Sequence, residues 1–318
     1  MRVLLIMTSS PHYAGTGFAE AWTAALERQG CEVDRLDGIP SRWALDGLPA
    51  DHWDVVVPHV LVEEVAAFAP TMQLTSLLEV AGVPLLNSLA ALVVSADKRA
   101  THAVWAANNL PQPRTFGLEY LDAWPLEGQA MVLKPSLGDG ARHLKLIGSL
   151  EDARAVETTW REDERRGGER RGPALLQEWI AEPACARLYA TPQRTSLAYE
   201  KARHRGALIT HGTVYERAYE PPPAMADLAR RMVKALGGGL MGVDVLTDAE
   251  GRMWALEANA PFGFDVTDAA QGDFVASVAV EAAKRAGASR SVPARTADAS
   301  VRVSSPTAGT FSSVSARA

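Results

Sequence analysis

The first 90 residues alternate short apolar runs with amphipathic segments, and this alternation restricts the fold more than any other feature of the chain. Each apolar run has the length and β-branched content of a buried strand, whereas the segments between them repeat apolar residues with helical spacing. Strands that alternate with helices build a parallel sheet covered by helices. We therefore predict an N-terminal parallel α/β domain, with strands at residues 2–7, 31–36, 53–60 and 83–88 and helices at residues 18–30 and 75–82.

A second restriction lies near the C-terminus, in GVDVLTDAEGRMWALEANAPFG, residues 242–263. Two strand-like runs flank a turn-rich segment, which predicts a β-hairpin with its turn at residues 250–251. In that register Asp244 lies opposite Glu257, and Asn259 lies on the same face, two residues beyond Glu257. Two facing carboxylates repel each other, and a hard cation such as Mg²⁺, which prefers oxygen ligands, removes that repulsion. A hairpin whose acids merely face solvent explains this stretch equally well.

The middle of the chain mixes helical and strand patterns. A helical pattern that starts near Ser95 or Asp97 is stopped by NLPQP, and a charged helical segment covers residues 151–172. From residue 130 to 147 the pattern is strand, glycine-rich turn, strand. We predict further strands at residues 174–180 and two or three within residues 185–220, and helices at residues 224–238 and 272–287.

The glycine-rich turn lies in VLKPSLGDGARHLKL, residues 132–146. A strand-borne lysine before such a turn can reach a phosphate, and glycines let backbone N–H groups approach the same phosphate. Lys134, Ser136, Gly138 and Gly140 are the candidates here, although the G-x-x-x-x-G-K-[ST] phosphate loop is absent from the chain. Taken alone, an ordinary hairpin is the better interpretation of this stretch.

Composition excludes several classes of function. The net charge of −6 gives no electrostatic footprint for nucleic acid, and no basic run favours an anionic membrane surface. Cys31 and Cys185 are the only cysteines, too few for a disulfide framework and without metal-ligand spacing. No apolar run reaches membrane-spanning length, and the apolar start is too short for a signal peptide. We therefore expect a cytoplasmic protein that binds neither nucleic acid nor membrane.

Four segments in this order, ADK…LPQPRT, KPSLGDGA, LLQEWI and GVDV–hairpin–LEANAPFG, resemble the ATP-grasp superfamily. Within it, the chain is most similar to the ribosomal-protein glutamate ligase and α-aminoadipate–carrier-protein ligase branch. The resemblance implies an α/β fold in which an N-terminal parallel α/β domain precedes two α+β subdomains that clasp ATP. The implied division is an N-terminal domain at 1–90, a central subdomain with the flap at 91–180, a C-terminal subdomain with the hairpin at 181–287, and a disordered tail at 288–318.

The resemblance also implies roles for individual residues. Asp244, Glu257 and Asn259 match the ligands of Mg²⁺ (or Mn²⁺), and Lys98 and Lys134 match the lysines that contact the α- and β-phosphates of ATP. The turn with Ser136, Gly138 and Gly140 matches the flap over the phosphates. The residues that match the adenine segment are Gln177, Glu178, Trp179 and Ile180, with Glu182 as the only nearby candidate for the ribose. The residues that match the reaction centre are Arg187 and Lys201. Arg203 belongs to the basic stretch that follows Lys201, whose charge could bind a carboxylated amino acid or an acidic peptide end, and a solvent-facing strand with scattered charge explains that stretch equally well.

The sequence departs from the family pattern at two informative places. Gly242 stands where D-alanine–D-alanine ligases have the arginine that contacts their oxyanion, which argues against D-alanine ligation. The loop NAPFGFD keeps Gly263 but moves the proline to Pro261. Because this loop normally touches the acceptor substrate, the resemblance does not identify the acceptor.

From these residues we expect an ATP-dependent carboxylate–amine ligase that forms an amide bond through an acyl-phosphate. Its partners would be a small-molecule carboxylate and an amine, the amine belonging to an amino acid, a peptide or a carrier protein, and the related ligases are often homo-oligomers. Two alternatives stay open. One is an ATP-grasp phosphotransferase or carboxylase that passes the acyl-phosphate elsewhere, and the other is a non-catalytic ATP-binding module.

Overall fold

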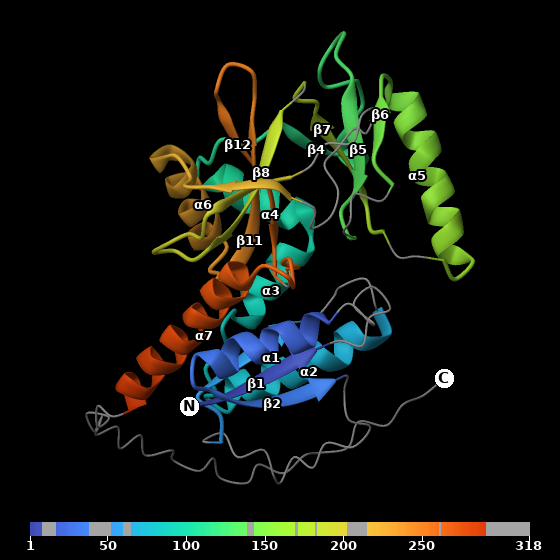
Figure 1. Cartoon of the computed structure of the whole chain (residues 1–318). Coiled ribbons are helices and arrows are strands. Elements are labelled where there is room, and N and C mark those ends of the chain that lie inside the picture. The colour runs from blue at the N-terminus through green and yellow to red at the C-terminus, as the bar shows by residue number, and fades with distance from the viewer. Residues whose placement is uncertain are drawn as a thin grey trace, which may run out of the picture.

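The computed structural model contains three separate β-sheets, each covered by helices (Figure 1). The residues that it describes are 1–7, 17–37, 52–59, 65–138, 143–168, 171–181, 183–201, 215–260 and 262–290. Among the helices of these residues, none combines the length and apolar character that crossing a lipid bilayer requires.

The N-terminal sheet is parallel, in the strand order β2–β1–β3, as the alternating pattern predicts. Its strands and their covering helices are β1 (Arg2–Met7), α1 (Phe18–Arg28), β2 (Glu32–Asp37), β3 (Val55–His59) and α2 (Val65–Val80). The predicted fourth strand is reduced to one bridge between Val56 and Leu85. The chain leaves the sheet there because Ser88 caps α3 (Leu89–Ala96), accepting a hydrogen bond from the backbone N–H of Ala91.

The central sheet has the order β4–β7–β5–β6 and is entirely antiparallel. Its elements are β4 (Thr115–Gly117), the short 3-10 helix η2 (Leu118–Tyr120), β5 (Met131–Pro135), β6 (Lys145–Ile147), α5 (Leu150–Arg165) and β7 (Ala174–Glu178). Met131, Leu133 and Leu176 pack with Trp160 of α5 into a core of their own. Because side chains alternate along a strand, Lys134 and Gln177 lie on the opposite face of this sheet.

The C-terminal sheet has the order β10–β9–β8–β11–β12. Its elements are β8 (Ala184–Ala190), β9 (Ala198–Lys201), β10 (Tyr215–Tyr219), α6 (Pro223–Ala235), β11 (Met241–Thr247) and β12 (Met253–Asn259). Val243 and Val245 of β11 join the apolar core that α6 covers. Asp244, between them, is therefore on the face turned away from α6.

The hairpin of β11 and β12 contains a β-bulge that the sequence did not predict. Near the turn Val245 pairs with Ala255, one residue away from the predicted register. The register then shifts, Leu256 is the extra residue, and Asp244 pairs with Glu257. The predicted pairing of the two acids is thus correct, but it depends on the bulge, because a bulge changes the face on which the following side chains lie.

The helical segment that precedes the central sheet is broken into two helices, α3 and α4 (Lys98–Ala107). The break is at Asp97, whose backbone is extended (φ −107°, ψ 113°) and whose carboxylate accepts a hydrogen bond of 2.8 Å from the N–H of Arg99. Asp97 is therefore the N-cap of α4, one of the two start positions that the sequence indicated.

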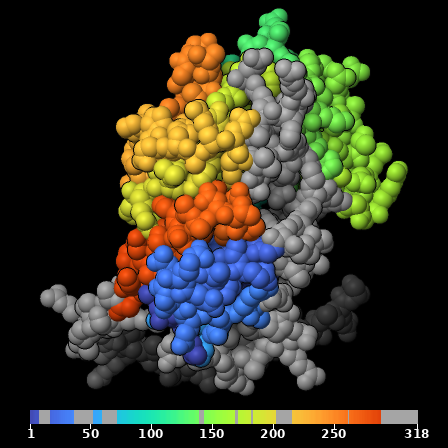
Figure 2. All heavy atoms as spheres, in the orientation of Figure 1, coloured from blue at the N-terminus to red at the C-terminus, as the bar shows by residue number. Residues whose placement is uncertain are grey.

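The last helix, α7 (Ala269–Arg290), joins the N-terminal domain to the C-terminal sheet. It lies against α1, β3 and β8, and its buried residues share one apolar core with Leu5, Trp22, Tyr189 and Phe262. Figure 2 shows α7 in direct contact with the N-terminal domain on this face of the molecule. The helix runs to residue 290, beyond the predicted start of the tail at 288, and the rest of the tail lies outside the described residues.

Candidate active site

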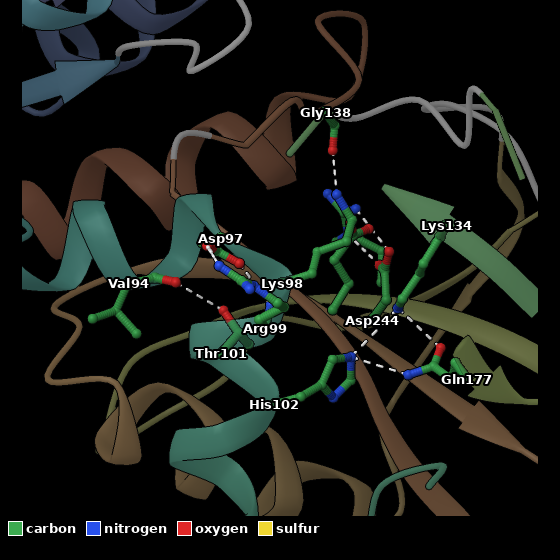
Figure 3. Close-up of polar contacts among 12 residues, drawn as sticks. Val94, Asp97, Lys98, Arg99, Thr101, His102, Lys134, Gly138, Gln177 and Asp244 are labelled. Carbon is green, nitrogen blue, oxygen red and sulfur yellow. Dashed lines mark hydrogen bonds and ion pairs between the residues drawn. The ribbon is translucent and has the colours of Figure 1, made fainter. Parts of the chain in front are cut away.

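The predicted site residues converge from three parts of the fold (Figure 3). Lys98 and His102 lie one turn apart on one face of α4, and Lys134 and Gln177 extend from the central sheet toward them. Arg187, Lys201, Asp244, Glu257 and Asn259 come from β8, β9, β11 and β12.

Asp244 is the most buried acid of the site, with only 1% of its surface exposed. Arg187, its direct neighbour across β8 and β11, donates from Nη2 to Oδ2 at 3.0 Å and from Nε to Oδ1. Lys201 Nζ donates to Asp244 Oδ2 at 2.7 Å. Burial alone would raise the pKa of the Asp244 carboxyl, but the charges of Arg187 and Lys201 outweigh it and lower this pKa to about 2. Asp244 is therefore a carboxylate at every physiological pH.

Glu257 and Asn259 lie beside Asp244 on the hairpin. Glu257 is the register partner of Asp244, and Asn259 pairs with Gly242, two residues before it. Burial and the charge of Asp244 raise the pKa of the Glu257 carboxyl, but three lysines together lower it overall: Lys98, whose Nζ is 3.6 Å from Glu257 Oε1, then Lys201 and Lys134. Two carboxylates and an amide oxygen on one face match the donors that Mg²⁺ or Mn²⁺ takes, while in this structure the charges of the two carboxylates are offset by Arg187, Lys201 and Lys98. The hairpin therefore fits a hard divalent cation.

Lys134 is almost fully buried, with 6% of its surface exposed. Its Nζ donates to Gln177 Oε1 at 2.9 Å and lies 3.4 Å from His102 Nε2. Burial and the nearby charge of Lys98 lower the pKa of the Lys134 ammonium to about 7, although Glu257 raises it. An amine held this way is ready for an anionic ligand, because a negative charge beside it would offset the cost of its burial.

His102 was not identified from the sequence, although it belongs to the same cluster. It follows Lys98 by four residues, so helical spacing places both on one face of α4. A lone histidine in a helix carries no such meaning by itself, and only the fold brings it to Lys134. Gln112, whose Oε1 lies 2.6 Å from His102 Nδ1, was missed for the same reason.

The flap begins where β5 ends. The backbone N–H of Lys98 donates to the carbonyl of Ser136 at 2.9 Å, and its Nζ donates to the carbonyl of Gly138. The Ser136 hydroxyl is buried and has no hydrogen-bond partner among the described residues. Gly138 has a φ of 107°, which favours glycine. Gly140, also predicted for the flap, lies outside the described residues.

The predicted adenine segment, residues 177–180, begins in the last two residues of β7 and continues past the end of the strand. Gln177 uses its side chain to hold Lys134, a role that the sequence did not indicate. The Glu178 carboxylate forms a two-armed ion pair with Arg114, and Trp179 and Ile180 are partly buried just after the strand. The ribose candidate Glu182 and the substrate candidate Arg203 lie outside the described residues, and their predicted roles stay predictions.

Gly242 makes room for a guanidinium. A Cβ at this position would lie 3.1 Å from Arg187 Nη1 and 2.8 Å from the Cβ of Phe262. Arg187 therefore lies over the place where the sequence lacks the arginine of D-alanine–D-alanine ligases. A positively charged side chain is thus present at this part of the site, but it belongs to β8, the strand next to β11.

The charges at the site favour an anion. Lys98, Lys134, Arg187 and Lys201 outnumber the carboxylates Asp244 and Glu257, and all six belong to one set of contacts and short-range electrostatic interactions. In a site of low dielectric, such preorganised cations stabilise the charge of phosphate oxygens strongly. The arrangement is suited to a polyphosphate bound together with a divalent cation.

Comparisons with known proteins bear on the fold of the chain. No family model matches the sequence. A D-alanine–D-alanine ligase from Chromohalobacter salexigens is 27% identical over 198 residues, which are 57% of this chain and 60% of that relative's length.

Two solved structures are similar over nearly the whole chain. The ATP-grasp ligase PsnB, complexed with a variant of its minimal precursor, Mg and ADP, has a TM-score of 0.65 at 16% identity and covers 88% of this chain and 98% of its own. The D-cycloserine synthetase DcsG has a TM-score of 0.65 at 16% identity and covers 90% of this chain and 100% of its own. These likenesses confirm the predicted fold.

Proposed function

Because the chain has the ATP-grasp fold, we propose that it is an ATP-dependent carboxylate–amine ligase. A carboxylate oxygen of one substrate attacks the γ-phosphorus of ATP, the bond to the β-phosphate oxygen breaks, and ADP leaves. The amine of the second substrate then attacks the acyl carbon, phosphate leaves, and the nitrogen loses a proton. The product is an amide.

The observation that carries this proposal is the pairing of Asp244 with Glu257 inside a group of basic side chains. Opposed carboxylates are costly unless something positive lies between or beside them. Lys98 approaches Glu257, and Arg187 and Lys201 hold Asp244. The same set of charges accommodates a triphosphate and its cation, which the reaction requires.

The residues act by positioning and by neutralising charge. Lys98 and Lys134 bind the phosphates, and Asp244, Glu257 and Asn259 would hold Mg²⁺, which neutralises phosphate charge when bound. Arg187 orients the Asp244 carboxylate and places a guanidinium near the reacting groups. This chemistry needs no nucleophilic side chain, so the catalytic contribution is electrostatic and geometric.

The proposal extends to the substrates only by class. PsnB was solved with a precursor peptide, and the other relatives are named for the joining of D-alanine or the synthesis of D-cycloserine. The sequence argument from Gly242 against D-alanine is offset by Arg187, whose guanidinium lies beside that position. We therefore propose an amino-acid or peptide carboxylate and an amine that belongs to an amino acid, a peptide or a carrier protein.

The test is a product scan by mass spectrometry with ATP, Mg²⁺ and pooled amino acids and short peptides, with phosphate release measured in parallel. Phosphate release that requires both a carboxylate and an amine is the expected result. Release without an amine, or no turnover across the panel, would contradict the proposed reaction.

The Glu257→Gln variant tests the metal assignment. It removes one negative oxygen from the hairpin and should lower turnover by roughly two orders of magnitude, as the loss of one preorganised electrostatic group does. Glu250→Gln is the matched control, because Glu250 lies at the turn of the same hairpin and pairs only with Arg252 among the described residues. Equal turnover for Glu257→Gln and the parent would exclude Glu257 as a ligand.

A further inference from the structure

His102 is oriented by a hydrogen bond on the side facing away from Lys134. Its ring nitrogen Nδ1 lies 2.6 Å from Gln112 Oε1, and Gln112 Nε2 donates to the carbonyl of His102 at 2.9 Å. Because the Gln112 amide nitrogen is committed to that carbonyl, its oxygen faces the ring. An amide oxygen only accepts hydrogen bonds, so the proton of His102 is on Nδ1 and Nε2 is a bare acceptor.

That acceptor faces two donors from the central sheet. Gln177 Nε2 is 3.0 Å from His102 Nε2 and also donates to Thr115 Oγ1 at 2.8 Å. Lys134 Nζ is 3.4 Å from the same ring nitrogen, and it donates to Gln177 Oε1 at 2.9 Å. The orientation of the Gln177 amide is thus fixed as well, because its oxygen must face the ammonium. Figure 3 shows the three side chains closing into one triangle.

We infer that His102 is a positioning residue that, together with Gln177, holds the Lys134 ammonium in place for the phosphates of ATP. The inference rests on the proposed function, since it presumes that Lys134 binds nucleotide. Within the described residues the ammonium has Gln177 Oε1 as its close acceptor and His102 Nε2 as a longer one, whose single lone pair is shared with the Gln177 amide, and its third N–H is left for a phosphate oxygen. A lysine side chain loses conformational entropy when it is fixed. Because His102 and Gln177 already fix Lys134 in the free protein, this entropy loss does not weaken ATP binding.

Neutral acceptors are what this place requires. The groups that face His102 are Lys134 from β5, Gln177 from β7, Gln112 after α4 and, one turn earlier on α4, Lys98. A charged imidazole would repel both lysines. Burial, followed by the charge of Lys134, lowers the pKa of His102 to about 3, so the ring stays neutral beside the ammonium.

A matched pair of variants separates positioning from simple packing. In His102→Gln the longer amide can place an oxygen where Nε2 was, whereas in His102→Asn the amide is one methylene too short to reach Lys134 but can still meet Gln112. Thr101→Val is the control, because Thr101 is equally buried in α4 and its hydroxyl donates to the carbonyl of Val94. All three are compared with the parent for Kd of ATP by calorimetry and for melting temperature.

We expect His102→Asn to raise the Kd of ATP roughly tenfold, in the range found when a partner of a ligand-binding residue is lost. His102→Gln should recover most of that affinity, and Thr101→Val should lower the melting temperature without changing Kd. In a Lys134→Met background, His102→Asn should have no further effect on Kd, because the contact through which it acts is gone.

The outcomes separate this inference from the proposed function. A parent protein that does not bind ATP would contradict the proposed function itself. A parent that binds ATP while His102→Asn binds equally well would overturn the inference about His102 alone. An equal loss of affinity in the parent and Lys134→Met backgrounds would also overturn it, since His102 would then act by another route.

Discussion

Lys134 is the residue whose ionisation we expect to report most directly on ATP binding. With the pKa of its ammonium near 7 in the free protein, the side chain is mostly neutral at pH 8. Bound phosphates stabilise the charged form and raise that pKa, so binding at pH 8 should take up a proton. Calorimetry in buffers with different ionisation enthalpies measures this uptake as a buffer-dependent heat.

Lys134→Arg is the control for this experiment, because a guanidinium stays protonated at every pH of interest. The variant keeps the positive charge near the phosphates and should lose the proton uptake. If the arginine variant takes up the same number of protons as the parent, another group titrates on binding and the assignment to Lys134 is wrong.

The residues that the sequence could identify share one property, which is that a pattern in the chain marks them. Asp244 and Glu257 interrupt apolar strand runs, and Lys134 precedes a glycine-rich turn. His102 and the pairing of Arg187 with Asp244 depend instead on which strands and helices become neighbours. Such contacts join residues far apart in the chain, and local periodicity does not predict them.

At the scale of single elements, the hairpin shows how a small irregularity decides a site. Without the bulge, the register near the turn would continue, Leu256 would face Asp244, and Glu257 would point into the core under α6. The sequence prediction assumed one register along the whole hairpin. That register holds only on the side of the bulge away from the turn, where the two acids pair, and the predicted pair was therefore correct. Bulges arise from local twist and packing rather than from a residue pattern, and sequence reading therefore missed this one.

Helix α4 is the element on which Lys98 and His102 depend, and its N-cap gives a test. Asp97→Ala removes the side-chain acceptor for the N–H of Arg99 and should lower the free energy of unfolding by about 1 kcal/mol. Because Lys98 is the first residue of the helix, fraying should also weaken ATP binding, whereas Asp97→Asn should preserve both. Urea unfolding and calorimetry provide the two measurements.

Ser149→Ala is the matched control, since Ser149 caps α5 on the far side of the central sheet, away from Lys134. It should cost a similar free energy of unfolding, about 1 kcal/mol, and leave the Kd of ATP unchanged. Equal effects of the Asp97→Ala and Ser149→Ala variants on ATP binding would show that the α4 cap has no special relation to the site.

On the scale of the whole molecule, the site lies where two bodies with separate cores meet. The N-terminal domain and the C-terminal sheet share the core around α7, whereas the central sheet has its own core under α5. Lys134 and Gln177 belong to the second body and Asp244 to the first. The sequence predicted the alternation of elements that builds each body, but not the joints between them, because a joint is made of side chains and backbone groups from distant segments.

Asn87 forms such a joint, and it should matter for stability without mattering for nucleotide binding. Its buried amide donates to the carbonyl of Leu240 at 2.8 Å and accepts from the N–H groups of Gly239 and Leu240 at 2.9 and 3.0 Å. The two segments are so close that a Cβ at Gly239 would lie 1.7 Å from the carbonyl oxygen of Leu86, so position 239 has no space for a side chain.

Asn87→Ala would leave the buried N–H and carbonyl of Leu240 and the part-buried N–H of Gly239 without this partner, and we expect the free energy of unfolding to fall by about 3 kcal/mol. Asn108→Ala, which removes an exposed amide from the end of α4, should stay within about 0.5 kcal/mol of the parent. The Kd of ATP, measured well below the melting temperature, should be the same for Asn87→Ala and the parent, because the hydrogen bonds of the Asn87 amide within the described residues go to Gly239 and Leu240. A loss of affinity that parallels the loss of stability would mean that the relation between the N-terminal domain and the C-terminal sheet itself sets the geometry of the site.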